Sequence, residues 1–159
     1  MKHFLLPDVQ AKPGVPLDHL TWAGRYVAEK QPDVIICIGD FADMESLSSY
    51  DVGKKSFEGR SYKADLDAAH TAMQLFLSPI RELQQQQRRN KERIYKPRFI
   101  LTLGNHEHRI PRAINSDRKL DGLISVKDLP YGDWEVYPFL EPVVVDGICY
   151  SHYFTSGQL

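Results

Sequence analysis

Four short polar groups in this sequence carry side chains that can bind divalent metal ions or move protons. Each follows an apolar run, and the groups are Asp8-Val9-Gln10, Gly39-Asp40-Phe41-Ala42-Asp43, Gly104-Asn105-His106-Glu107 and Ser151-His152. Carboxylate and amide oxygens with imidazole nitrogens suit Mn, Fe, Zn, Ni or Mg rather than a cysteine-based zinc site. If the groups converge, they can hold two ions about 3.5–4 Å apart, bridged by one carboxylate, as two-metal hydrolases do.

The apolar runs that precede these groups predict β-strands. β-Branched or otherwise apolar runs at residues 4–7, 33–38 and 99–103 are bounded by Pro, Gly or Asp, which is typical of buried strands. Two more runs, 143–145 and 148–150, flank Asp146-Gly147 and predict a hairpin. Ligands of open α/β sheets bind beyond the carboxyl ends of the strands, so we expect the polar groups to meet at one edge.

The stretches between the strands predict helices. Apolar side chains recur at helical spacing in residues 17–30 and 64–91, and residues 107–114 begin a short helix with Glu107 suited to its N-terminus. Pro79 is expected to kink or split the second helix, because proline removes a backbone donor. Strands and helices together indicate one α/β domain over residues 1–159.

In their order along the chain, the polar groups resemble the motifs of the calcineurin-like metallophosphoesterases. That family carries D-x-H, G-D-x-x-D, G-N-H-[ED], a lone His after a strand and then G-H-x-H, and the resemblance runs from residue 4 to residue 159. Residues 46–50, 57–60 and 152–154 resemble the subgroup carried on phage and prophage genomes. The family implies a two-sheet α/β/β/α sandwich that hydrolyses phosphoesters.

The resemblance also implies how the metal ions are held. Asp8, Gln10 and Asp40 would bind a first divalent ion, and Asp40 would bridge to a second ion that Asn105 and His152 also bind. Manganese is the preferred metal, with Fe, Zn, Ni and Mg left open. Gln10 stands where the family has histidine, and a neutral amide oxygen shifts the preference toward magnesium- or manganese-like ions.

Catalytic roles follow from the same resemblance. His106 would protonate the leaving oxygen or stabilise the phosphoryl charge, and Asp43 would orient His106 through a hydrogen bond. Arg109 follows closely, and it either contacts a substrate phosphate or pairs with a neighbouring acid. Two ions and a positioned imidazole together meet the needs of phosphoryl transfer.

The chain ends at Leu159 without a G-H-x-H segment, which in the family completes both metal sites and the second sheet. We therefore expect a fragment of a longer protein, with the sandwich incomplete at its C-terminus. An uncovered sheet edge would then allow self-association. A truncated or degenerate fold that binds metal or a partner without turnover is the alternative to an enzyme.

The substrate stays open between a phosphomonoester and a phosphodiester, which includes nucleic acid. Met44-Glu45 stands where the protein phosphatases of the family have Arg-Gly, and this disfavours a protein phosphatase. Residues 81–98 contain seven basic and two acidic residues, a net charge of +5. A solvated helix face is favoured for this stretch, yet it keeps a nuclease open.

Composition sets outer bounds on the class of protein. With 42% hydrophobic residues, 26% charged residues and a net charge of −1, the sequence excludes wholesale disorder and a polybasic nucleic-acid binder. Cys37 and Cys149 lie in apolar runs and are predicted to be buried and reduced. No run approaches the ~18 apolar residues of a membrane span, so we expect a cytoplasmic protein without a membrane partner.

Overall fold

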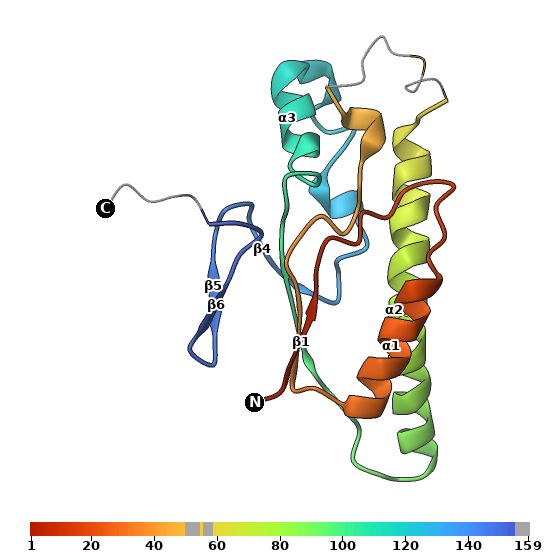
Figure 1. The fold of residues 1–159 in the computed structure, drawn as a ribbon. Coiled ribbons are helices and arrows are strands. Elements are labelled where there is room, and N and C mark those ends of the chain that lie inside the picture. Colours follow the sequence, from red (N-terminus) through yellow and green to blue (C-terminus); the bar gives the residue numbers. More distant parts are fainter. Residues whose placement is uncertain (50–54, 56–58, 155–159) are drawn as a thin grey trace.

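The computed structural model describes residues 1–49, 55 and 59–154, and its centre is a four-stranded parallel sheet (Figure 1). The strands lie in the order β1-β2-β3-β4, and their bounds are His3–Leu6, Val34–Cys37, Arg98–Thr102 and Glu135–Tyr137. All four residues of β2 are buried, as expected for a central strand with both faces covered. The predicted α/β class is confirmed, and the three predicted strands agree with β1, β2 and β3 to within two residues at each end.

Two helices cover one face of this sheet, α1 Asp18–Lys30 and α2 Tyr62–Arg89 (Figure 1). Of the two expected effects of Pro79, the split is wrong, because α2 runs unbroken through this residue, and the kink stays a prediction. The buried face of α2 includes Phe76, Leu77 and Ile80 around Pro79, so burial of that face offsets the lost hydrogen bond. α1 approaches closely at the same level, where a Cβ on Gly24 would lie 2.2 Å from the Phe76 carbonyl oxygen.

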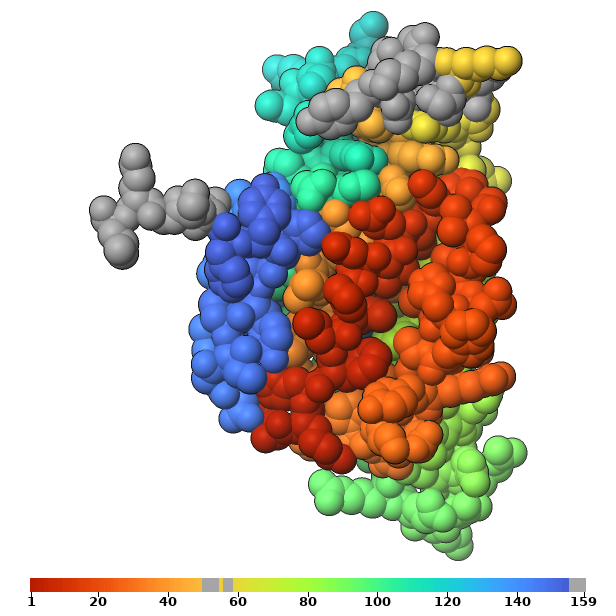
Figure 2. Space-filling view, in the orientation of Figure 1, coloured from red at the N-terminus to blue at the C-terminus, as the bar shows by residue number. Residues whose placement is uncertain are grey.

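A two-stranded antiparallel sheet covers the other face. Its strands are β5 Val143–Val145 and β6 Ile148–Tyr150, joined by the predicted turn, in which Asp146 and Gly147 both have positive φ. Val143 and Val145 pack against β2 and β3. The space-filling view shows this layer in blue beside the red N-terminal strand (Figure 2).

The prediction that Cys149 is buried is wrong, whereas Cys37 is buried as expected. Cys149 pairs with Val144 across the hairpin, and both side chains are exposed. Because side chains alternate along a strand, Val143 and Val145 face the core and the Val144–Cys149 pair faces away.

Shorter elements differ from the expected ones. The third helix is α3 Arg109–Ser116, which begins two residues later than expected, and β4 was not predicted. The short 3-10 helices are η1 Glu45–Leu47, η3 Arg118–Leu120 and η4 Val126–Asp128. Within the described part of the chain, no helix is long and apolar enough to cross a membrane. Tyr50, Phe57 and Glu58, part of the subgroup resemblance, lie outside the described residues.

Candidate metal centre

The loops that follow β1 and β2 are joined by backbone hydrogen bonds, and this places the first two polar groups side by side. The Gln10 amide donates to the Asp40 carbonyl at 2.8 Å, and the Ala11 amide donates to the Phe41 carbonyl at 2.8 Å. Asp8, Gln10 and Asp40 all have positive φ, at 31°, 47° and 52°. Residues other than glycine rarely adopt this region, and such strain clusters at functional sites.

Two glycines allow the loops after β2 and β3 to approach each other. A Cβ on Gly104 would lie 2.0 Å from Oδ1 of Asp40, and a Cβ on Gly39 would lie 2.6 Å from the Gly104 nitrogen. Gly39 also has φ +95°. Glycine is therefore required at both positions if the Asp40 carboxylate is to reach its observed place.

The buried side chain of Glu107 holds the loops after β2 and β3 together. Its buried carboxylate accepts hydrogen bonds from the amides of Asp40, Phe41, Ala42 and Gly104 at 2.8–3.2 Å and from the Tyr131 hydroxyl at 2.7 Å. Glu107 is fully buried, so charge-assisted hydrogen bonds replace the water that its carboxylate loses. The expectation that Glu107 opens a helix is wrong, because α3 begins only at Arg109.

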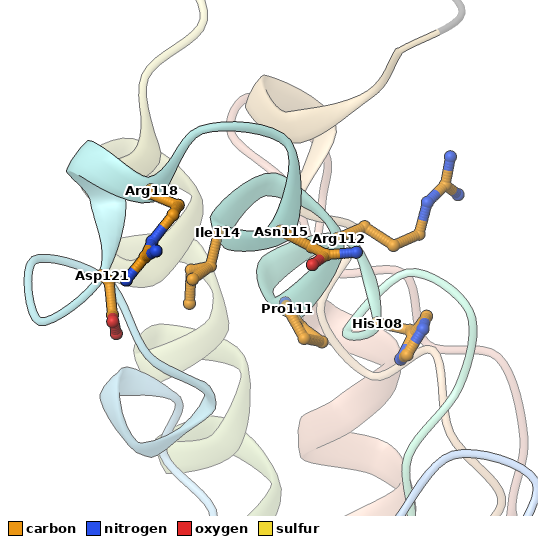
Figure 3. A pocket seen from close by; sticks show the side chains of 7 residues that line it. All are labelled: His108, Pro111, Arg112, Ile114, Asn115, Arg118 and Asp121. Atoms are coloured by element: carbon orange, nitrogen blue, oxygen red, sulfur yellow. The ribbon is translucent and has the colours of Figure 1, made fainter.

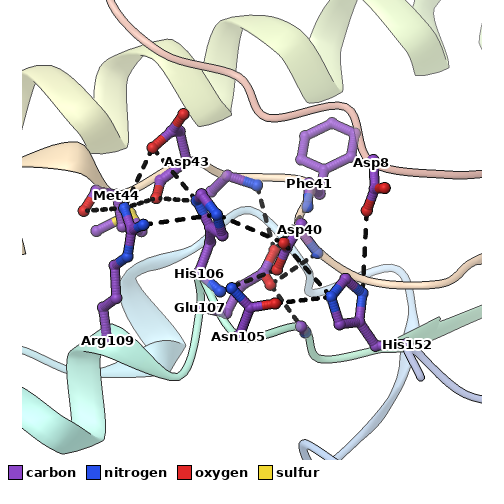
Figure 4. Close-up of polar contacts among 12 residues, drawn as sticks. Asp8, Asp40, Phe41, Asp43, Met44, Asn105, His106, Glu107, Arg109 and His152 are labelled. Carbon is purple, nitrogen blue, oxygen red and sulfur yellow. Dashed lines mark hydrogen bonds and ion pairs between the residues drawn. The ribbon is translucent and has the colours of Figure 1, made fainter. Parts of the chain in front are cut away.

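Asp8, Asp40 and His152 converge from the ends of β1, β2 and β6, and we call these three residues the ligand group (Figure 4). One ligand atom from each residue lies within 4.8 Å of the other two. Asn105 joins them from the end of β3, with its Oδ1 at 2.8 Å from Nε2 of His152. Four of the five predicted metal ligands are thus brought together.

The hydrogen bonds of His152 leave one ring nitrogen for a ligand. Nδ1 lies 2.8 Å from the Ile38 carbonyl oxygen, which can only accept, so Nδ1 carries a proton. Nε2, the nitrogen that carries the lone pair when the ring is neutral, lies 2.8 Å from Oδ1 of Asn105 and 3.4 Å from Oδ2 of Asp40. Oxygen atoms and a nitrogen lone pair that face one another repel, so this arrangement is favourable only when a cation lies among them. A carbonyl partner on the other ring nitrogen is also the usual arrangement in a metal-binding histidine.

Gln10, the fifth predicted ligand, contacts Asp40 only through the hydrogen bond of its backbone amide. Its side chain is exposed, and it makes no hydrogen bond with the other residues that the structure describes. A Gln10 amide bound to a metal ion therefore stays a prediction.

His106 and Asp43 lie beside the ligand group and contact each other. Nδ1 of His106 lies 2.8 Å from the Asp43 carbonyl oxygen and 3.3 Å from Oδ1 of the Asp43 carboxylate. This hydrogen bond raises the pKa of His106 above its usual value, against the opposing effect of burial. Burial by itself would raise the pKa of Asp43, but the hydrogen bond from His106, with the nearby cations, holds that pKa below its usual value.

Arg109 takes the second of its two predicted roles and pairs with an acid. Its guanidinium donates to the Asp43 carbonyl at 2.9 Å and lies 3.2 Å from the Asp43 carboxylate. Lys12 reaches the same carboxylate from the loop after β1, with Nζ 3.7 Å from Oδ2. Three cationic or protonatable groups thus surround Asp43, and a contact between Arg109 and a substrate phosphate stays a prediction.

Sequence reasoning did not anticipate Glu107 as a buried acceptor or Lys12 as a neighbour of Asp43. For Glu107 a signal was present, because it directly follows Gly104-Asn105-His106 within a motif. Lys12 carries no comparable signal, because its position depends on the pairing of two loops distant in sequence. The basic stretch at 81–98 lies at the other edge, since Arg98 begins β3 and Asn105 follows the end of β3.

Comparisons of this chain with protein-family models, with curated proteins and with solved structures give no match.

Proposed function

We propose that this chain is a metal-dependent phosphoesterase, with divalent metal ions held by the ligand group and Asn105. The convergence of His152 Nε2 with Oδ1 of Asn105, at 2.8 Å, and Oδ2 of Asp40, at 3.4 Å, is the observation that carries the proposal. A hard carboxylate, an amide oxygen and an imidazole together suit manganese or a similar divalent ion. In the two-metal form of the proposal, Asp8, Gln10 and Asp40 bind one ion, and Asp40 bridges to a second ion that Asn105 and His152 also bind.

Bound divalent ions would neutralise charge on the phosphoryl oxygens and lower the pKa of a water molecule. The chain itself provides the proton for the leaving oxygen. His106 is held through Nδ1 by Asp43, and its Nε2 lies 3.6 Å from Oδ2 of Asp40, on the side of the ligand group. A histidine with a raised pKa carries the proton that a general acid donates.

Two further features support this function. The positive φ at Asp8 and Asp40 sets the backbone of both loops, and the five hydrogen bonds to Glu107 hold the loop of Asp40 in place before any ligand arrives. Such preorganisation is what electrostatic catalysis requires.

We also propose that the helical layer, the parallel sheet and the β5–β6 sheet belong to an α/β/β/α sandwich of the metallophosphoesterase type.

Metal titration and hydrolysis assays on the same protein test the proposal. Calorimetry with manganese should show binding that Asp40→Asn weakens strongly, because Asp40 is central to both proposed ion sites. Manganese should also support hydrolysis of p-nitrophenyl phosphate or bis(p-nitrophenyl) phosphate, and Asp40→Asn should abolish it. The matched control is Asp67→Asn, an exposed aspartate on α2. Hydrolysis that is unchanged in Asp40→Asn would refute the proposal.

A metal-binding domain without turnover is the second candidate. The number of ligands favours it, because among the described residues a single group of two carboxylates and one histidine could hold a metal ion, whereas the hydrolytic proposal uses two ions. Tight metal binding with no hydrolysis of either aryl ester would identify this alternative.

A further inference from the structure

A hollow of about 670 Å³ is lined by residues of α3 and of the segments directly before and after it (Figure 3). Its polar lining residues are His108, Arg112, Asn115, Arg118 and Asp121, and two apolar side chains of α3 complete it. Neither the core of the fold nor the chemistry proposed above uses this hollow. Its volume is within the range of small-molecule sites and exceeds what a lone phosphate needs.

The charge of the hollow favours an anion. Arg112 and Arg118 are exposed, and neither guanidinium makes an ion pair with another described residue. Asp121 offsets one of the two positive charges. Guanidinium groups match phosphate oxygens in geometry and in charge, so phosphate groups are the anions that two free arginines suit best.

A row of aromatic rings connects the hollow with the ligand group. The His108 ring stacks on Phe139 with centroids 4.8 Å apart, and Phe139 meets Tyr153 edge-on at 5.6 Å. Tyr153 lies 5.5 Å from the ring of His152 and is 47% exposed. Aromatic side chains of this kind stack on unpaired nucleobases without regard to their sequence.

From the free arginines and the aromatic row we infer that the substrate is a single-stranded oligonucleotide. One base would stack on the row, and the scissile phosphodiester would lie at the ligand group. Two other phosphates of the strand would meet Arg112 and Arg118, whose side chains extend to opposite sides of α3 (Figure 3). A duplex fits poorly, because its bases are already stacked on one another. The inference rests on the proposed phosphoesterase function.

The reaction balances as the hydrolysis of one phosphodiester bond. A bond forms between phosphorus and the oxygen of water, and the bond from phosphorus to the leaving sugar oxygen breaks. His106 donates a proton to that leaving oxygen, and the water gives up one proton to solvent. No oxidant, reductant or co-reactant besides water is needed.

Fluorescence anisotropy with a labelled ten-nucleotide dT strand in EDTA tests the binding surface without metal or turnover. The double variant Arg112→Gln/Arg118→Gln should weaken binding roughly tenfold, and the slope of log Kd against log salt should fall by about 1.4, at ~0.7 per phosphate contact. Phe139→Leu should weaken binding roughly fivefold or more through lost stacking. A matched duplex should bind more weakly than the single strand.

The matched control is Arg88→Gln/Arg89→Gln, which removes the same charge at the far end of α2. This control should keep wild-type affinity. If the control loses affinity while the α3 variant keeps it, the strand binds at the far end of α2 and the inference is overturned. The inference is also overturned if the wild-type protein does not bind the single strand. Hydrolysis of bis(p-nitrophenyl) phosphate, which is too small to span the hollow, tests the proposed function separately.

Discussion

One ring nitrogen of His152 binds the backbone, and the other faces the candidate metal site. Nδ1 donates to the Ile38 carbonyl at 2.8 Å, and Nε2 faces Oδ2 of Asp40 and Oδ1 of Asn105, where a metal ion would meet all three atoms. The Nδ1 of His106 likewise lies 2.8 Å from a backbone carbonyl, that of Asp43, but it also lies 3.3 Å from the Asp43 carboxylate, which favours a protonated ring. The two histidines of the site therefore suit different roles, His152 as a metal ligand and His106 as a proton donor.

Replacement of His106 tests this division of roles. His106→Asn should reduce kcat by roughly 10² or more, the scale of general-acid catalysis, because the leaving oxygen loses its proton donor. Manganese affinity, measured by calorimetry, should stay close to that of the wild type. His70→Asn, on the exposed face of α2, is the control and should change neither quantity. If His106→Asn loses the metal ion, His106 is a ligand and the assignment is wrong.

At the scale of elements, the site depends on how closely the ends of β2 and β3 approach each other. Gly39 and Gly104 remove the side chains that would separate the two loops, and Glu107 then binds four amides across them. The sheet supplies the direction of the strands, but these three residues set the position of the Asp40 carboxylate. Residues that bind no metal ion are thus expected to control metal affinity.

Gly104→Ala should lower manganese affinity by about tenfold or more, as changes next to metal ligands commonly do. The new Cβ would lie 2.0 Å from Oδ1 of Asp40, so the carboxylate must move. Gly132→Ala is the matched control, since no atom lies within 4 Å of a Cβ built there. Calorimetric titrations of both variants make the comparison, and equal affinities would show that Asp40 does not need its observed position.

Glu107→Gln should lower the free energy of unfolding by about 3 kcal/mol, because the amide nitrogen of glutamine would face backbone donors and leave some of them unpaired. Tyr131→Phe removes one of the five donors and should cost about 1 kcal/mol. Urea denaturation of the two variants measures both values. A Glu107→Gln variant as stable as the wild type would mean that the carboxylate does not hold the loops.

The same elements explain how far the sequence could predict the fold and the site. β2 and β3 are runs of apolar residues before glycine, and the hairpin surrounds Asp-Gly, so local signals suffice for them. β4 is three residues long and begins with Glu135, and only its pairing with β3 makes it a strand. The environment of Glu107 is set by loops from two strands, and no local pattern contains that information.

At the scale of the whole molecule, the ligand group joins two layers whose other described contacts are a small apolar cluster and a few polar pairs, such as His3 with Tyr150 at 2.7 Å. Asp40 follows β2 of the parallel sheet, whereas His152 follows β6 of the two-stranded sheet. Among the described residues, the buried apolar side chains of this cluster are few: Val34, Ile36, Ile100, Val143 and Val145. A metal ion bound by Asp40 and His152 would therefore hold the β5–β6 sheet against the rest of the fold.

Manganese should accordingly stabilise the folded chain and protect the β5–β6 amides from hydrogen exchange. At a free metal concentration 100 times Kd, the free energy of unfolding should rise by about 2.7 kcal/mol, because the ion binds the folded state alone. His152→Ala should lose most of this increase and the added protection in the hairpin. His19→Ala, an exposed histidine on α1, should keep both. Denaturation with and without manganese, together with exchange measured over residues 143–150, decides the matter. An equal manganese effect in His152→Ala would mean that the ion binds elsewhere and that the two sheets are not joined through it.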